Sequence, residues 1–347
     1  MIRRDLIIAY IRDSSDPRSS SEVHDFLASQ KEDISLVTAK RELSQIESDG
    51  LIESVGAGRS TAYRITTRGR LLSDVRMESY GTAEPDRRGG MKSFNFELFK
   101  AMTFDPFSPE EKEVLDEATR VYRRRIEGQT STIHEKELER FVIELSWKSS
   151  RIEGNTYTLF DTERLIRDGV PASGNSKDET TMILNHKEAF KYIYDHKDRF
   201  TELSRASIEE VHSLLVRDLN VSTGLRAKPV GVTGSSYIPL DNKFQIAEAL
   251  GELIKAVSAM PHGYAKSLIC LLGLSYIQPF EDGNKRTSRL MANALLLAHG
   301  LAPLSYRSVD ENDYREAVLA FYELNSLMPF KKIFIEQYDF AARNYLL

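Results

Sequence analysis

Residues 264–277, YAKSLICLLGLSYI, are nearly all apolar. Their apolar side chains are not confined to one stripe, so a helix formed here would be hydrophobic on every side. Such a helix is buried when other helices surround it, which predicts that it lies at the centre of a domain. Pro279 ends the helix, because proline lacks the amide hydrogen that a helix interior needs. Cys270, the single cysteine of the chain, falls within this stretch and is expected to be a buried structural thiol.

The chain from about residue 105 onward shows helical periodicity almost throughout. Ser108 and Pro109 fit the N-cap and first position of one helix, and a second long helix is expected to end near Gly154. Further helices are expected at 185–198, 204–219, 242–260, 285–300, 311–327 and 330–347. The exception is 228–241, whose two glycines, two prolines and β-forming residues predict a small β-hairpin.

The first seventy residues predict a small separate domain. Three helical segments, 3–13, 19–30 and 35–50, precede two strand-like segments joined by GAGRS, whose glycines permit a hairpin turn. The third helix is expected to place Val37, Leu43 and Ile46 on its apolar side. This order resembles a winged helix-turn-helix domain, which would offer Thr38, Lys40, Arg41 and Ser44 to the major groove of DNA and Arg59 at the wing. Basic and acidic residues balance in this region, so a role in protein contacts or dimerisation is the alternative.

Composition gives the class of the chain. Its 347 residues, 41% apolar and 29% charged, predict a globular protein with a winged-helix domain at 1–72, a linker at 73–104 and a helical domain at 105–347. No apolar run reaches the roughly 18 residues that span a bilayer. No membrane association is therefore expected, and the single cysteine suits a reducing cytoplasm. The seven histidines show no spacing that would hold structural zinc.

Polar residues suited to phosphate follow the apolar helix directly, in YIQPFEDGNKRTSR at 276–289. Gly283 lets backbone approach a ligand closely, and amide groups at the start of the next helix bind anions. Arg286 and Arg289 lie three residues apart and therefore share a face of that helix. Asp282 or Glu281 would hold Mg²⁺ beside the phosphates. The segment predicts a site for a Mg²⁺–nucleoside phosphate, and the alternative is a solvated helix start with a structural Asn turn.

The same residues resemble the signature of the Fic family, His-Pro-Phe-x-(Asp/Glu)-Gly-Asn-x-Arg-x-x-Arg. Pro279, Phe280 and the residues from Asp282 onward match it, and Gln278 takes the place of the histidine. The resemblance implies a mainly α fold, a Fic-type helical domain with a β-hairpin flap, preceded by the small winged-helix domain. It also implies transfer of AMP from ATP to a Ser, Thr or Tyr hydroxyl of a target protein. The positions that would serve are Asp282 for Mg²⁺, Gly283, Asn284 and Lys285 at the anion hole, and Arg286 and Arg289 for phosphates.

Two further segments extend the resemblance. The expected hairpin is similar to the family's flap, in which target docking would use Val232, Thr233, Gly234, Ser235, Ser236 and Tyr237. Upstream, Ser149, Glu153 and Gly154 are similar to the inhibitory motif Ser/Thr-x-x-x-Glu-Gly/Asn of self-inhibited members. The resemblance implies that Glu153 pairs with Arg289 and competes with the γ-phosphate of ATP. A homodimer is also plausible from the family.

Two residues depart from the family pattern. Gln278 has no titrating proton and cannot replace a general base, whose contribution is typically about 10² to 10⁴ in rate. Lys285 stands where most AMP-transferring members have Gly, and Asn-Lys-Arg is similar to the phosphate-transferring Doc branch. Three interpretations follow: an AMP transferase disabled at Gln278, by nature or by engineering; a variant with altered phosphoryl or nucleotidyl transfer; or an ATP-sensing regulator acting through the N-terminal domain. His186 and His212 have no spacing link to the segment and are expected to be buried helix histidines.

Overall fold

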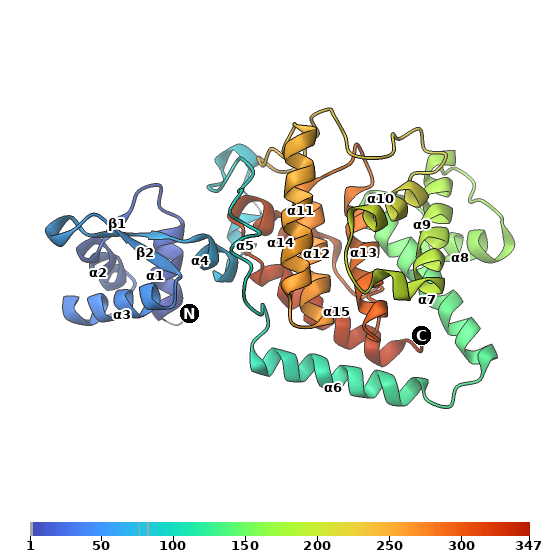
Figure 1. Cartoon of the computed structure of the whole chain (residues 1–347), viewed down its shortest axis with the longest axis horizontal. Coiled ribbons are helices and arrows are strands. Elements are labelled where there is room, and N and C mark those ends of the chain that lie inside the picture. The colour runs from blue at the N-terminus through green and yellow to red at the C-terminus, as the bar shows by residue number, and fades with distance from the viewer. Residues whose placement is uncertain (1–2, 76, 82) are drawn as a thin grey trace. The chain divides into compact units, whose positions relative to one another are not determined.

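The computed structural model describes residues 3–75, 77–81 and 83–347. The mainly helical class expected from the sequence is confirmed, and the strands form one small sheet (Figure 1). The chain divides into two compact units, each described by itself below. Unit 1 comprises Met1–Met102, Val232–Tyr237 and Glu316–Phe330, and unit 2 comprises Thr103–Gly231, Ile238–Arg315 and Lys331–Leu347.

The N-terminal part of unit 1 combines helices with a three-stranded antiparallel sheet of order β1-β3-β2. Its elements are α1 (Arg3–Arg12), β1 (Arg18–Ser19), α2 (Ser20–Ser29), α3 (Leu36–Ser48), β2 (Ile52–Val55), η1 (Gly58–Ser60), β3 (Ala62–Ile65), α4 (Thr67–Leu72), α5 (Met77–Tyr80) and η2 (Pro85–Arg87). Ser19 caps α2 in a capping box with Glu22. The register pairs Ser54 with Tyr63 in the β2–β3 hairpin.

The buried side of α3 differs from the expected one. Ala39, Leu43 and Ile46 face the core, whereas Val37 is 77% exposed. Two residues along a helix turn about 200°, so Val37 lies opposite Ala39 and cannot share its face. The prediction that Val37 belongs to the apolar side is therefore wrong.

The stretch expected to be a linker carries buried side chains within unit 1. Leu98, Phe99 and Met102 are buried. The hydroxyl of Ser326 donates to the carbonyl of Ser73 at 2.6 Å. The stretch therefore carries buried apolar side chains and a hydrogen bond to a distant segment of unit 1.

Unit 2 is built around the apolar helix. Its helices are α6 (Pro109–Ile126), α7 (Ser131–Ile152), α8 (Leu159–Asp168), α9 (Lys177–Asp195), η3 (Lys197–Phe200), α10 (Arg205–Leu215), α11 (Lys243–Ala259), α12 (Gly263–Ile277) and α13 (Asn284–Ala298). Two further helices, α14 (Glu311–Leu324) and α15 (Met328–Asn344), each have residues in both units. All of α12 except Lys266 is buried, and α12 packs against α11 and α13 (Figure 1). The central position follows from its composition. No helix within the described ranges is long and apolar enough to cross a membrane.

The expected hairpin at 228–241 is absent from the strands of the described residues. Arg226 instead holds the two ends of the segment, since its guanidinium donates to the carbonyl oxygens of Lys228 and Leu240. Within the segment, the amide of Ser235 donates to the carbonyl of Val232 at 3.1 Å in a tight turn. The segment is a side-chain-anchored loop because these contacts take backbone groups that a strand ladder would use.

Candidate functional site

The site is built on the turn between α12 and α13. Asn284 closes this turn: its side chain accepts from the amide of Phe280 and donates to the carbonyl of Phe280, both at 2.8 Å. Gly283 precedes α13 with φ of +78°, a conformation that favours glycine. An added Cβ there would also lie 3.2 Å from Val216. Backbone amides at the start of α13 are therefore held in a fixed, compact turn.

Gln278 lies at the C-terminal end of α12 in the left-handed conformation, with φ of +51°. Its side-chain amide donates to the carbonyl of Ser275 at 2.6 Å and so caps the last turn of the helix. Arg226 donates through Nε to the carbonyl of Gln278 at 2.7 Å, and its own amide donates to the carbonyl of Pro279. The residue in the histidine position is thus buried and held by its neighbours on both sides.

Arg286 is the first of the two arginines on α13. Its guanidinium is buried and pairs with Oδ2 of Asp282 at 3.0 Å, while the Asp282 side chain remains 63% exposed. Nη1 of Arg286 is buried without a hydrogen-bond partner. Burial lowers the pKa of Arg286, although Asp282 and Glu153 partly offset this effect. An uncompensated guanidinium nitrogen beside a helix N-terminus suits an anionic oxygen.

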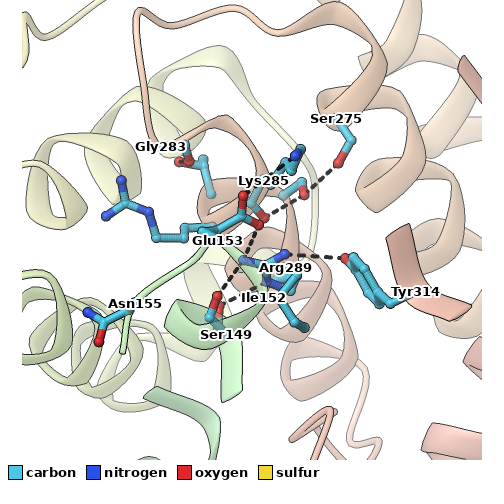
Figure 2. A network of polar contacts seen from close by, with 12 residues as sticks. Ser149, Ile152, Glu153, Asn155, Ser275, Gly283, Lys285, Arg289 and Tyr314 are labelled. Atoms are coloured by element: carbon cyan, nitrogen blue, oxygen red, sulfur yellow. Dashed lines mark hydrogen bonds and ion pairs between the residues drawn. The ribbon is translucent and has the colours of Figure 1, made fainter. Parts of the chain in front are cut away.

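Arg289 is fully buried, and its partners come from α7 with its C-cap and from α14. Nε donates to the Ser149 hydroxyl at 2.9 Å, and Nη2 donates to the Ser149 carbonyl at 2.8 Å. Nη2 also forms an ion pair with Oε1 of Glu153 at 2.8 Å. The Tyr314 ring lies 5.6 Å from the guanidinium carbon. Figure 2 shows Glu153 and Ser149 turned toward Arg289.

Glu153 has a second cation beside it. Nζ of Lys285 lies 3.6 Å from Oε2 of Glu153, and the Glu153 side chain is 19% exposed (Figure 2). Burial acts to raise the pKa of Glu153, but the positive charges of Arg289 and Lys285 outweigh it and leave the pKa below its ordinary value. Glu153 is therefore ionised at neutral pH and bridges the two cations. Gly154, directly after it, has φ of +96° and allows the chain to leave α7 at this point.

Two buried histidines that the sequence did not connect with the signature lie beside the site: one contacts the inhibitory motif and the other contacts the signature turn. Nε2 of His186, on α9, lies 2.8 Å from the Ser149 hydroxyl. His212, on α10, stacks on Phe280 at 3.7 Å and donates from Nε2 to the carbonyl of Asp282 at 3.0 Å. Burial lowers the pKa of both rings, so they are neutral. Their sequence signal was only an apolar helix context, which does not reveal contacts between distant helices.

The remaining candidate residues lie in unit 1. Lys40, Arg41 and Arg59 are exposed, whereas the hydroxyl of Thr38 lies 3.0 Å from that of Ser35, the N-cap of α3. Residues 232–237 form part of unit 1 as well. The structure thus brings the inhibitory motif and the signature residues together within unit 2.

The residues present fit a Mg²⁺–nucleotide. Asp282 offers an exposed carboxylate, and the turn into α13 offers amides and the unpartnered Nη1 of Arg286. Mg²⁺ is usually held by one or two carboxylates together with substrate phosphates. The described residues contain no cluster of three or more His, Cys, Asp or Glu that could hold a metal.

Known proteins resemble this part of the chain. Residues 202–296 match the model of the Fic/DOC family, which confirms the family resemblance for this region. Proteins named protein adenylyltransferase Fic are similar: that of Nematostella vectensis is 29% identical over 174 residues, 49% of this chain and 41% of the relative. That of Culex quinquefasciatus is 29% identical over 48% of this chain and 34% of the relative. The chain thus spans less than half the length of these relatives.

The fold is also found among solved structures. Fic-1 from C. elegans superposes with a TM-score of 0.57 at 19% identity, over 72% of this chain and 80% of that one. A Fic domain containing signaling protein from Bacteroides thetaiotaomicron gives a TM-score of 0.55 at 18% identity, over 66% and 94%. At these identities the likeness concerns the fold.

Proposed function

We propose that the chain is a self-inhibited, Fic-type nucleotide-binding protein, related in chemistry to protein adenylyltransferases. Its substrate would be ATP with Mg²⁺, and its acceptor a Ser, Thr or Tyr hydroxyl of a target protein. The observation that carries the proposal is the ion pair between Glu153 and Arg289. A carboxylate that occupies a fully buried guanidinium competes for the donors that a terminal phosphate would need.

The roles of the site residues follow from their positions. The amides of α13 and Nη1 of Arg286 would bind phosphate oxygens, and Asp282 would hold Mg²⁺, which neutralises phosphate charge when bound. Asn284 and His212 stabilise the turn through hydrogen bonds with its backbone. Arg289 would receive the γ-phosphate only after Glu153 has moved away.

Gln278 sets the expected rate. It cannot take a proton from an attacking hydroxyl, and its amide already donates to Ser275. Turnover is therefore expected to be slow or absent in this chain while nucleotide binding persists. Lys285 adds a positive charge beside Glu153 and the anion hole, so a Doc-like phosphoryl transfer is the alternative chemistry of the same site.

Labelled ATP tests this proposal directly. The chain, Glu153→Gly, and Glu153→Gly combined with Gln278→His are incubated with Mg²⁺ and ATP carrying the label on either the α- or the γ-phosphate. Incorporation from α-labelled ATP by the double variant supports AMP transfer, and incorporation only from γ-labelled ATP supports phosphoryl transfer. No nucleotide binding and no incorporation from either label would refute the proposal.

The N-terminal part favours a second candidate function, a nucleotide-sensing DNA-binding regulator. Its helices and antiparallel sheet leave Lys40 and Arg41 exposed on α3, and Arg59 exposed between β2 and β3. Affinity for DNA of the promoter upstream of its own gene would be measured at two salt concentrations, with and without ATP. Binding that is sequence-selective, salt-dependent and lost in Lys40→Glu/Arg41→Glu supports this function. Equal binding by that variant contradicts it.

A further inference from the structure

Unit 1 contains a buried carboxylate outside the signature site. Glu323, on α14, has a side chain only 1% exposed, and Arg88, at 4%, places Nε 3.2 Å from its Oε2. A buried ion pair is not in general a gain in stability over apolar side chains of similar volume. What distinguishes this pair is where its remaining hydrogen-bonding groups point.

Both partners contact residues 232–237, here called the target loop because the family resemblance on which the proposed function rests implies that a target docks there. Oε1 of Glu323 accepts from the amide of Ser236 at 3.0 Å and from the Ser235 hydroxyl at 2.7 Å. Nη2 of Arg88 donates to the carbonyl of Gly234. Both the guanidinium and the carboxylate of the ion pair therefore form hydrogen bonds with main-chain groups of the target loop.

The same pair is fixed to the stretch that follows the N-terminal helices and sheet. The Tyr80 hydroxyl donates to Oε2 of Glu323 at 2.6 Å, and the amide of Met91 donates to the Glu323 carbonyl at 2.6 Å. Gly90 has φ of +145°, and a Cβ there would lie 2.6 Å from that carbonyl. Tyr80, Gly90 and Met91 thus lie close against this end of α14.

Several main-chain groups of the target loop already have partners within the chain. Besides Gly234 and Ser236, the amide of Ser235 donates to Val232 and the amide of Tyr237 donates to the Ser235 hydroxyl at 3.1 Å. Addition of an extended segment to a loop edge uses free amide and carbonyl groups. A docking partner would have to displace donors and acceptors that the chain itself supplies.

We infer that the Arg88–Glu323 pair closes the target loop and acts as a second restraint, separate from Glu153, on the docking of an extended protein segment. This inference rests on the proposed function for the identity of the loop. Arg88 and Glu323 are positioning residues, because they act through their hydrogen bonds to the target loop. Release of Arg88 frees the Gly234 carbonyl and loosens the hold on Ser236.

Arg88→Lys in the full chain tests this restraint. Lysine keeps a positive charge for Glu323 but lacks the planar fork that reaches Gly234 and the carboxylate together. Amide hydrogen exchange in peptides covering 232–237 is expected to speed up roughly tenfold, since a hydrogen bond to a charged group is worth about that factor. Arg87→Lys, an exposed neighbour, is the control and should leave exchange unchanged. Unchanged exchange in Arg88→Lys would overturn the inference.

A second measurement distinguishes an ion pair that restrains target docking from one that supports it. In the Glu153→Gly/Gln278→His background, Arg88→Lys should raise labelling of lysate proteins about tenfold, with ATP–Mg²⁺ affinity within twofold of the background. Reduced labelling with faster loop exchange would show that the pair supports docking, and equal labelling would show that it does not limit docking; either result would overturn the restraint. If the background labels nothing, the transferase part of the proposed function fails, and the exchange measurement alone decides whether the pair holds the loop.

Discussion

Replacing Glu153 by Gln removes one charge from the most enclosed contact of the site. The carboxylate lies 2.8 Å from Arg289 and 3.6 Å from Lys285. With an effective dielectric constant of about 20, these separations correspond to gross attractions of about 6 and about 5 kcal/mol. Desolvation offsets much of this energy, so the net effect follows from breaking a buried pair rather than from the sum.

The expected cost without nucleotide is about 3 kcal/mol in the free energy of unfolding. Breaking a buried pair typically costs about 3–5 kcal/mol. The low end applies here because Ser149 still accepts two hydrogen bonds from Arg289. With ATP–Mg²⁺ present, a phosphate oxygen can replace the lost carboxylate. Affinity for ATP should then rise about 10- to 100-fold, the equivalent of one charge-assisted hydrogen bond.

The assay combines urea denaturation with calorimetric titration of ATP–Mg²⁺. Glu135→Gln is the matched control, because Glu135 lies exposed on the same helix, α7, and should change neither quantity. Lower stability of Glu153→Gln that ATP restores is the expected pattern. Lower stability with unchanged ATP affinity would refute the reasoning, since Glu153 would then be a structural partner of Arg289 and no competitor of phosphate.

Three other perturbations test separate parts of the site. Gln278→His in the Glu153→Gly background should raise AMP labelling by about 10² to 10⁴, and a rise below tenfold would contradict the assignment of the base position. Burial lowers the pKa of His186 and His212, so their contribution to stability is full above the unfolded pKa of about 6.5 and is lost as pH falls below it, by up to about 1.4 kcal/mol per pH unit for each ring. Urea denaturation at pH 7.5 and at pH 5.5 should show a smaller loss of stability on acidification for His186→Gln than for the unchanged chain. An equal loss would contradict the contribution of His186 to this pH dependence. Asn284→Ala leaves the amide and carbonyl of Phe280 unpaired and should lower the free energy of unfolding by about 2–4 kcal/mol, whereas Asn284→Asp, which keeps an acceptor, should lose less.

Local sequence was sufficient for the parts of the molecule that depend on neighbouring residues. The apolar run of 264–277 could only be a central helix, and α12 is buried along its length. Gly283, Asn284 and the two arginines lie in one turn and the helix that follows it, so their spacing already placed them at one site. The N-cap at Ser108 followed in the same way from side-chain chemistry next to the helix.

Contacts between distant segments were decided by tertiary packing. Ser149 and Arg289 are 140 residues apart, and only the packing of α7 against α13 brings their atoms within hydrogen-bond reach. Family resemblance supplied the partner of Glu153, but Lys285 as a second cation, and His186 and His212 behind the site, came from the structure. Periodicity identifies a buried face and not the residue on the other side of it.

The segment 228–241 is a second case in which tertiary contacts, and not local sequence, decided the structure. Its composition favours a hairpin, yet Arg226 takes the carbonyls at its ends. Further along the same segment, Glu323 takes the amide of Ser236. Strand propensity is a weak local preference, and buried charged groups that need hydrogen bonds outweigh it. The sequence by itself determined the central helix and the phosphate-suited turn, while the tertiary structure decided which charges restrain them.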